Sequence, residues 1–150
     1  MSFGETPITL VGNLTDDPEL KFTEGGAALA KFTIAVTPRS FDRTSNQWKD
    51  GTTAFYRCAA WRNLAEHVAE SLSKGSRVVA TGRMRQHDWT TDQNEKRSML
   101  AVEIDDIGAS VRFTTVQINA KRTAQNGPAS TDPWATANSS AAGPDAEPPF

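Results

Sequence analysis

The stretch that decides the fold covers residues 53–89 and reads TAFYRCAAWRNLAEHVAESLSKGSRVVATGRMRQHDW. Polar and apolar residues alternate over residues 53–62, which is typical of a half-buried strand. Apolar residues then recur at helical spacing over residues 64–72, and Asn63 is a suitable N-cap for that helix. Alternation resumes over residues 77–89. The stretch therefore predicts a strand, a short helix and a second, longer strand.

The rest of the domain is predicted to be extended. Strands are expected over residues 8–14 and 28–37, and over residues 97–107 as a hairpin partner of the long strand. Residues 39–52 are polar and predict a long loop or a loose hairpin, whereas residues 111–118 predict either a weak sixth strand or an arm that spans subunits. Five strands with a short helix between the third and the fourth give the order of an OB-fold barrel, an all-β fold, although other small β-barrels share much of this pattern.

Charge is unevenly distributed along the chain. Its 150 residues have a formal charge of −2, which at face value argues against a nucleic-acid-binding protein. However, residues 1–122 hold all 16 basic residues and 15 acidic ones, whereas residues 123–150 hold no basic residue and three acidic ones. The last segment has five prolines and only two large apolar side chains, Trp134 and Phe150, so it buries too little apolar surface to fold. We expect a domain over residues 1–110 and a disordered acidic tail, which is either passive or partner-binding.

The sequence disfavours several classes of protein. No apolar run approaches the roughly 20 residues of a membrane helix, and the N-terminus lacks the features of a secretory signal. The lone cysteine, Cys58, is expected in the core or in a subunit interface, with a disulfide across a symmetry axis as the alternative. Neither His67 nor His87 has a ligand-spaced partner, and no nucleophile–base motif is present. We expect a cytoplasmic protein with no metal, no cofactor and no catalytic residue.

On two neighbouring strands, arginines are interleaved with large aromatic residues on one face. These residues are Phe55, Arg57 and Trp61 on the first strand, and Arg83, Arg85, His87 and Trp89 on the second. Single-stranded nucleic acid requires this combination, because bases stack on exposed rings while guanidinium groups neutralise the phosphates. The alternative is that the three aromatic residues belong to the core; the arginines favour a binding face, since a charge is rarely buried unpaired. Phe41 and Trp48 in the polar loop extend the track.

Several motifs resemble those of the bacterial single-stranded DNA-binding protein family, in the same order and spacing. They are ITLVGNLTDDPEL at residues 8–20, GG at residues 25–26, AKFTIA at residues 30–35, LAE at residues 64–66, KGS at residues 74–76, GRMR at residues 82–85, and Trp89. The resemblance covers residues 6–107 and implies an OB-fold homotetramer that wraps single-stranded DNA without strong sequence preference. It also implies work at the nucleoid, in DNA replication, recombination and repair.

The resemblance assigns roles to individual residues of the domain. It implies base stacking on Phe41, Phe55, Trp61 and Trp89, and phosphate contacts by Arg57, Lys74 and Arg85. Arg83 joins the phosphate contacts because it shares the face of Arg85. Phe55 and Trp61 exchange the Phe and Trp of the commonest family pattern, and acidic Asp88 stands where the family usually has a basic residue.

The segments after the domain carry further likeness. Residues 111–122 resemble a strand that clamps subunits together in an actinobacterial branch of the family. The tip DAEPPF, at residues 145–150, resembles the family's partner-binding motif and implies contacts with replication and repair proteins through Asp145, Glu147, Pro149 and Phe150. This tip is less acidic than usual and has Pro148 in place of an aliphatic residue, which is expected to weaken partner binding without changing its mode.

Three hypotheses about function follow. The first is a non-enzymatic single-stranded DNA-binding protein, either the housekeeping protein or a specialised paralogue. The second is an interaction platform that acts mainly through its tail. The third, an RNA-binding OB-fold module, is disfavoured because the aromatic motifs of cold-shock proteins are not evident.

Overall fold

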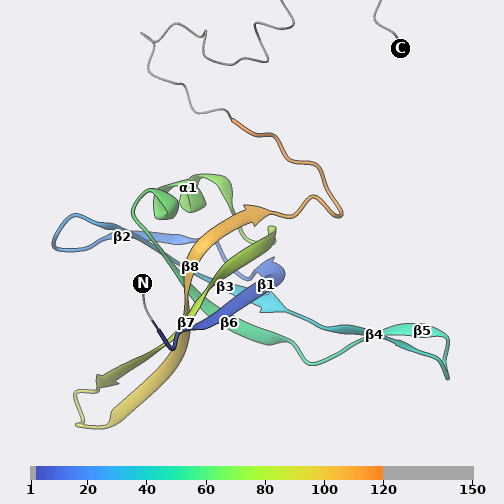
Figure 1. Ribbon diagram of the computed structural model, residues 1–150, viewed down its shortest axis with the longest axis horizontal. Helices are drawn as coiled ribbons and strands as arrows, with labels where there is room; N and C mark the ends of the chain where they lie inside the picture. The colour runs from blue at the N-terminus through green and yellow to red at the C-terminus, as the bar shows by residue number, and fades with distance from the viewer. Residues whose placement is uncertain (1–2, 120–150) are drawn as a thin grey trace, which may run out of the picture. The chain divides into compact units, whose positions relative to one another are not determined.

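The computed structural model describes residues 3–119. The chain divides into two units, Met1–Val116 and Gln117–Phe150, and nearly all of the second unit, including the predicted acidic tail, lies outside the described residues. Within the described residues, the elements in chain order (Figure 1) are β1 Thr6–Leu14, β2 Glu19–Phe22, β3 Ala28–Val36, β4 Arg39–Asp42, β5 Gln47–Asp50, β6 Ala54–Trp61, α1 Asn63–Ser71, β7 Arg77–Thr90 and β8 Lys96–Ala109.

The main sheet closes into a barrel. Its hydrogen-bonded order is β1-β7-β8-β6-β3-β2, and a short pairing of Asn13 and Leu14 in β1 with β3 completes the closure. Neighbouring strands are antiparallel except β6 and β8, which are parallel. The strands expected from the sequence correspond to β1, β3, β6, β7 and β8, and α1 lies between the third and the fourth of them, so the OB-fold prediction is confirmed.

The core is formed by the inward faces of these strands. On β3, for example, Ala30, Phe32 and Ile34 are buried while Lys31 is exposed, as period-two alternation requires. The helix α1 packs against β2, β3 and β6 and buries Val68. The outward faces of β3, β6, β7 and β8 therefore remain available for a site.

The start of α1 differs from the prediction that Asn63 caps it. Asn63 is the first helical residue, and Arg62 takes the N-cap position with a φ of 60° and no side-chain cap. The cause is tertiary: the backbone N–H of Arg62 donates to the carbonyl of Ala28 at 2.8 Å, and this bond fixes the turn between β6 and α1.

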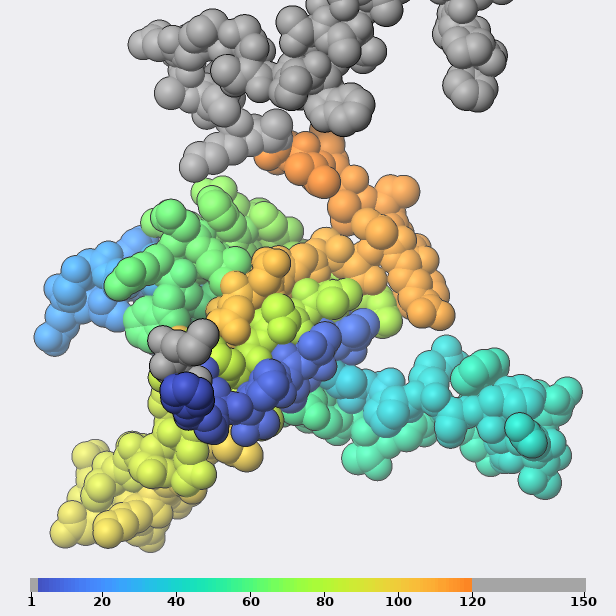
Figure 2. Space-filling view, in the orientation of Figure 1, coloured from blue at the N-terminus to red at the C-terminus, as the bar shows by residue number. Residues whose placement is uncertain are grey.

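Residues 39–52 form a hairpin. The strands β4 and β5 make a separate two-stranded sheet in which Phe41 is opposite Trp48. The hydroxyl groups of Thr37 and Thr53 lie 2.7 Å apart at its base. The hairpin projects from the barrel as an arm (Figure 2).

Residues 111–119, the last of the described residues, contain no strand, so the additional strand predicted over residues 111–118 does not form. The pairing of β8 with β7 ends where Ala109 is opposite Val78, and Ser110 donates its N–H to the carbonyl of Arg77, the first residue of β7. No further length of β7 is left to pair with. The alternative arm or clamp over residues 111–122 needs a second copy of the chain and stays a prediction.

Candidate nucleic-acid interface

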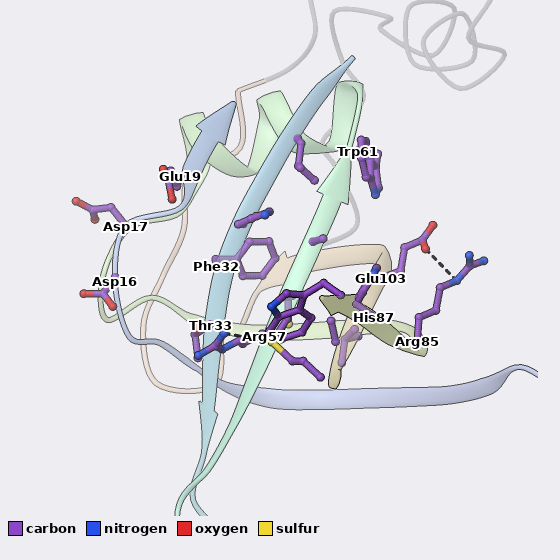
Figure 3. Close-up of a pocket in the computed structure, with 18 residues that line it drawn as sticks. Asp16, Asp17, Glu19, Phe32, Thr33, Arg57, Trp61, Arg85, His87 and Glu103 are labelled. Carbon is purple, nitrogen blue, oxygen red and sulfur yellow. Dashed lines mark hydrogen bonds and ion pairs between the residues drawn. The ribbon is translucent and has the colours of Figure 1, made fainter. Parts of the chain in front are cut away.

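Neighbouring strands β3, β6, β8 and β7 line a groove of about 840 Å³ (Figure 3). Its aromatic residues include Trp61 at the end of β6 and Trp89 near the end of β7. Their side chains are half-exposed, with 41% and 45% of their surface accessible. The alternative that Trp61 and Trp89 are core residues is therefore wrong.

The pairing register arranges the lining residues in rows across the sheet. Arg57 of β6 is opposite Thr33 of β3, and Ala59 is opposite Glu103 of β8. Arg85 of β7 is opposite Ala101 of β8. Because the side chains of Ala59 and Ala101 are small, the floor of the groove lies low between the larger residues around it.

Four of the eight predicted DNA-binding residues lie together in this groove: Arg57, Trp61, Arg85 and Trp89. Arg57 donates from Nη1 to Sδ of Met99 at 3.1 Å, and within residues 3–119 it is in no ion pair. Its charge is therefore available to a phosphate.

The other four predicted residues lie outside the lining of the groove. Phe55 is exposed at the start of β6, on the same face as Arg57. Lys74 is exposed before β7, and its backbone N–H donates to the carboxylate of Asp17 at 2.8 Å. Phe41 lies on the β4–β5 hairpin, and Arg83 is engaged with carboxylates.

Arg83 and Arg85 belong to a network of ion pairs beside the groove. Arg83 contacts Glu5 at 3.1 Å, Asp105 at 3.0 Å and Glu103 at 3.4 Å. Arg85 contacts Glu5 at 3.1 Å and Glu103 at 3.0 Å. The hydrogen bonds that Arg83 donates to Glu5 and Asp105 raise the pKa of its guanidinium. Arg83 is thus committed to its neighbours rather than directed at the groove.

A β-bulge brings Asp105 into this network. The register of β7 and β8 shifts between Thr81 and Gly82, so that Asp105 has no partner across the ladder. Gly82 is required there, because a Cβ at this position would collide with the carbonyl oxygen of Glu103.

The groove also has an acidic side that the sequence reasoning missed. Asp16 and Asp17 in the β1–β2 connection and Glu19 at the start of β2 line it together with Lys31 of β3. Lys31 was detectable, because it alternates with the buried residues of its strand, but the approach of the β1–β2 connection is a tertiary feature. The groove is therefore asymmetric in charge.

The β4–β5 hairpin carries a second aromatic pair. The rings of Phe41 and Trp48 meet edge to face, with centroids 5.5 Å apart. Asp42 holds the turn: its carboxylate pairs with Lys49 at 2.7 Å and accepts hydrogen bonds from Thr44 at 2.9 Å and Ser45 at 3.1 Å. These contacts, led by the one to Lys49, lower the pKa of Asp42 to about 2. The hairpin thus presents its rings on an ordered scaffold.

The remaining expectations concern metals, the cysteine and the tail. Among the described residues, no group of three or more His, Cys, Asp and Glu side chains is placed to hold a metal ion. No helix within residues 3–119 is long and apolar enough to cross a membrane.

Cys58 lies in the core, and burial raises the pKa of its thiol to about 12. The predicted partner-binding residues Asp145, Glu147, Pro149 and Phe150 lie outside the described residues.

Comparisons with known proteins agree with this geometry. A family profile described as "Single-strand binding protein family" matches residues 6–114. The "Single-stranded DNA-binding protein" of Paenarthrobacter aurescens is 48% identical over 98% of this chain and 99% of its own length. The protein of the same name from Mycolicibacterium smegmatis is 50% identical over the same shares. The crystal structure of the small single-stranded DNA-binding protein from Streptomyces coelicolor superposes with a TM-score of 0.62 at 30% identity, covering 73% of this chain and 97% of that one.

Proposed function

The chain belongs to the single-strand binding protein family, and from this premise we propose that it binds single-stranded DNA without strong sequence preference. The observation that carries the proposal is the groove in which half-exposed Trp61 and Trp89 lie together with Arg57. Relatives that align over nearly their whole length are named for the same ligand, which supports it.

Binding combines stacking with charge neutralisation. Bases stack on Trp61 and Trp89, and each such contact contributes about 1–3 kcal/mol whatever the base, because every base has a π-face. Arg57 and Lys31 neutralise phosphates between them. A duplex hides its base faces, so it is a poorer ligand for this groove.

In our proposal, the path of the bound single-stranded DNA extends beyond the groove. Phe55 continues the outward face of β6 next to Arg57, and the rings of Phe41 and Trp48 form a further platform on the hairpin. Lys74 and Arg85 supply additional positive charge to the phosphates. These contacts lengthen the bound segment of DNA rather than select a sequence.

We further propose a homotetramer in the cytoplasm, associated with the nucleoid, that protects single strands during DNA replication, recombination and repair. It has no catalytic step, because stacking and ion pairing leave the DNA chemically unchanged. The tip of the tail, with Phe150 and the acidic residues Asp145 and Glu147, recruits replication and repair proteins by filling an apolar pocket rimmed with basic side chains.

A titration followed by intrinsic tryptophan fluorescence tests the function. The full chain is titrated with oligo(dT), oligo(rU) and duplex DNA at several salt concentrations. Strong quenching by oligo(dT) that weakens as salt rises is expected, because stacking quenches tryptophan and phosphate contacts are screened. Preference for oligo(rU) would instead favour the RNA-binding module, and indifference to all three would favour the interaction platform.

A further inference from the structure

We propose that Glu103 and Glu5 restrain Arg85 in the DNA-free protein, so that these two carboxylates set the affinity for single-stranded DNA and its dependence on salt. This inference rests on the proposed function and names residues that regulate the same groove. It makes the two glutamates positioning residues, since they act on DNA through Arg85.

The geometry is a closed ring of charges. Glu5 Oε1 accepts from both arginines, at 3.1 Å from Nη1 of Arg83 and 3.1 Å from Nη2 of Arg85. Glu103 also bridges both, with Oε1 at 3.4 Å from Nη2 of Arg83 and Oε2 at 3.0 Å from Nε of Arg85. Arg85 is therefore held from two directions.

The ring lies at the wall of the groove, where DNA would pass. Arg85 and Glu103 both line the groove, and Figure 3 shows their contact as a dashed line. The side chains of Glu5 and Glu103 are only 27% and 29% exposed, so solvent and salt screen their pairs with Arg85 less than those of a fully exposed pair.

The charges of the network do not favour an incoming phosphate. Two arginines face three carboxylates, those of Glu5, Glu103 and Asp105. A phosphate that pairs with Arg85 has to displace a carboxylate, so it exchanges one ion pair for another instead of adding one. The displaced carboxylate of Glu103 then stays beside the phosphate and repels it.

Neutralising Glu103 is expected to leave the fold intact. Arg83 keeps Glu5 and Asp105 as partners when Glu103 loses its charge. Glu103→Gln also preserves the length of the side chain and its β8 backbone contacts. The restraint on Arg85 can therefore be weakened while the network around Arg83 remains.

The test uses the full chain and a fluorescein-labelled oligo(dT), with fluorescence anisotropy as the readout. Glu103→Gln is expected to tighten binding about fivefold at low salt and less at high salt. Glu5→Gln is expected to act in the same direction and serves as the second variant. Asp105→Asn is the matched control, because it removes the same charge from a carboxylate that contacts Arg83 and not Arg85, and it is expected to tighten binding much less than Glu103→Gln.

A double variant separates restraint from simple repulsion. On an Arg85→Ala background, Glu103→Gln is expected to tighten binding far less than in the unmodified chain, because Arg85 is no longer there to be released. If Glu103→Gln tightened binding equally in the unmodified chain and in the Arg85→Ala chain, the restraint would be overturned, and the effect would be assigned to direct repulsion between Glu103 and the phosphate. No tightening in either glutamate variant, with thermal unfolding unchanged, would overturn the inference and leave the proposed function standing. Failure of the unmodified chain to bind oligo(dT) would overturn both.

Discussion

Trp61 is half-exposed although the residue before it, Ala60, is fully buried. This contrast is a consequence of strand geometry, because successive side chains point to opposite faces. Arg57 and Phe55 share the outward face with Trp61, and Cys58 shares the inward face with Ala60. The position of a side chain along β6 therefore decides whether it stabilises the fold or is available for a ligand.

Replacing Trp61 with alanine is expected to weaken oligo(dT) binding about 5-fold to 150-fold, the loss of one stacking contact. Thermal stability should change little, because the ring is half-exposed. Anisotropy titration measures the affinity. Phe22→Ala is the control, since Phe22 is an exposed aromatic residue on β2 that does not line the groove. Equal weakening by both variants would contradict a specific role for Trp61.

The residue scale also marks where sequence reasoning stops. Alternation predicted correctly that Arg57 and Trp61 share a face of β6 and that Arg85 and Trp89 share a face of β7, because this depends only on local geometry. The prediction that these two strands are neighbours was wrong, since β8 lies between them in the sheet. It could not predict that Arg83 is occupied, since its partner Glu5 lies 78 positions away and Asp105 reaches it through a bulge. Contacts between distant segments depend on the closed barrel, which no local pattern encodes.

At the scale of elements, the β4–β5 hairpin shows how a polar segment becomes ordered. Asp42 organises the turn, and Asn46 has a positive φ of 56°, a conformation that asparagine tolerates. The sequence left open whether residues 39–52 form a loop or a hairpin, because their polar composition is typical of both. The N-cap of α1 was predicted wrongly because a tertiary contact sets it: the backbone N–H of Arg62 donates to Ala28 of β3, and this bond places Arg62 instead of Asn63 at the start of the helix.

The hairpin is expected to loosen in acid. Since the pKa of Asp42 falls from 3.8 to about 2 on folding, its stabilisation of the turn is complete above about pH 4 and is lost as pH falls through about 2. Carbon NMR of the Asp42 carboxyl group measures the titration. Asp42→Asn should show faster amide exchange in β4 and β5 at pH 7, with exchange in the barrel unchanged. A carboxyl that titrates at its ordinary value would contradict the contacts described.

Barrel closure depends on the close approach of β1 and β3. A Cβ at Gly12 would collide with the carbonyl oxygen of Ala35, at the edge of the short β1–β3 pairing. Gly12→Ala is therefore expected to lower the free energy of unfolding by about 1–3 kcal/mol, the usual cost of overpacking. Urea denaturation measures it. Gly25→Ala is the control, because a Cβ there meets no atom within 4 Å, and an equal loss in that variant would refute the closure argument.

At the scale of the whole molecule, the net charge of −2 conceals two different compositions. The first 122 residues hold nearly equal numbers of basic and acidic residues, whereas the last 28 are acidic without any basic residue. Within the domain, charge is again distributed unevenly, with Arg57 in the groove and Asp16 and Asp17 along one side of it. Overall charge is therefore a poor guide to the ligand, and local arrangement is the informative quantity.

Removing residues 146–150 is expected to leave oligo(dT) affinity unchanged and to abolish the capture of replication and repair proteins. The reason is that the proposed DNA contacts lie in the barrel and the hairpin, whereas the proposed partner contacts are made by Phe150 and its acidic neighbours at the tip. Paired pull-downs with the full and the shortened chain measure capture, and anisotropy measures DNA binding. Identical partner sets from both chains would show that the tip is inert.

The central claim is that single-stranded DNA lies in the groove formed by β3, β6, β8 and β7. Photocrosslinking with an oligonucleotide that contains 5-iodo-deoxyuridine tests it directly, because the halogenated base joins covalently to aromatic rings on which it stacks, and mass spectrometry identifies the residue. We predict adducts at Trp61 and Trp89. Adducts confined to exposed aromatic residues outside the groove, such as Phe22 or Phe113, would contradict the claim.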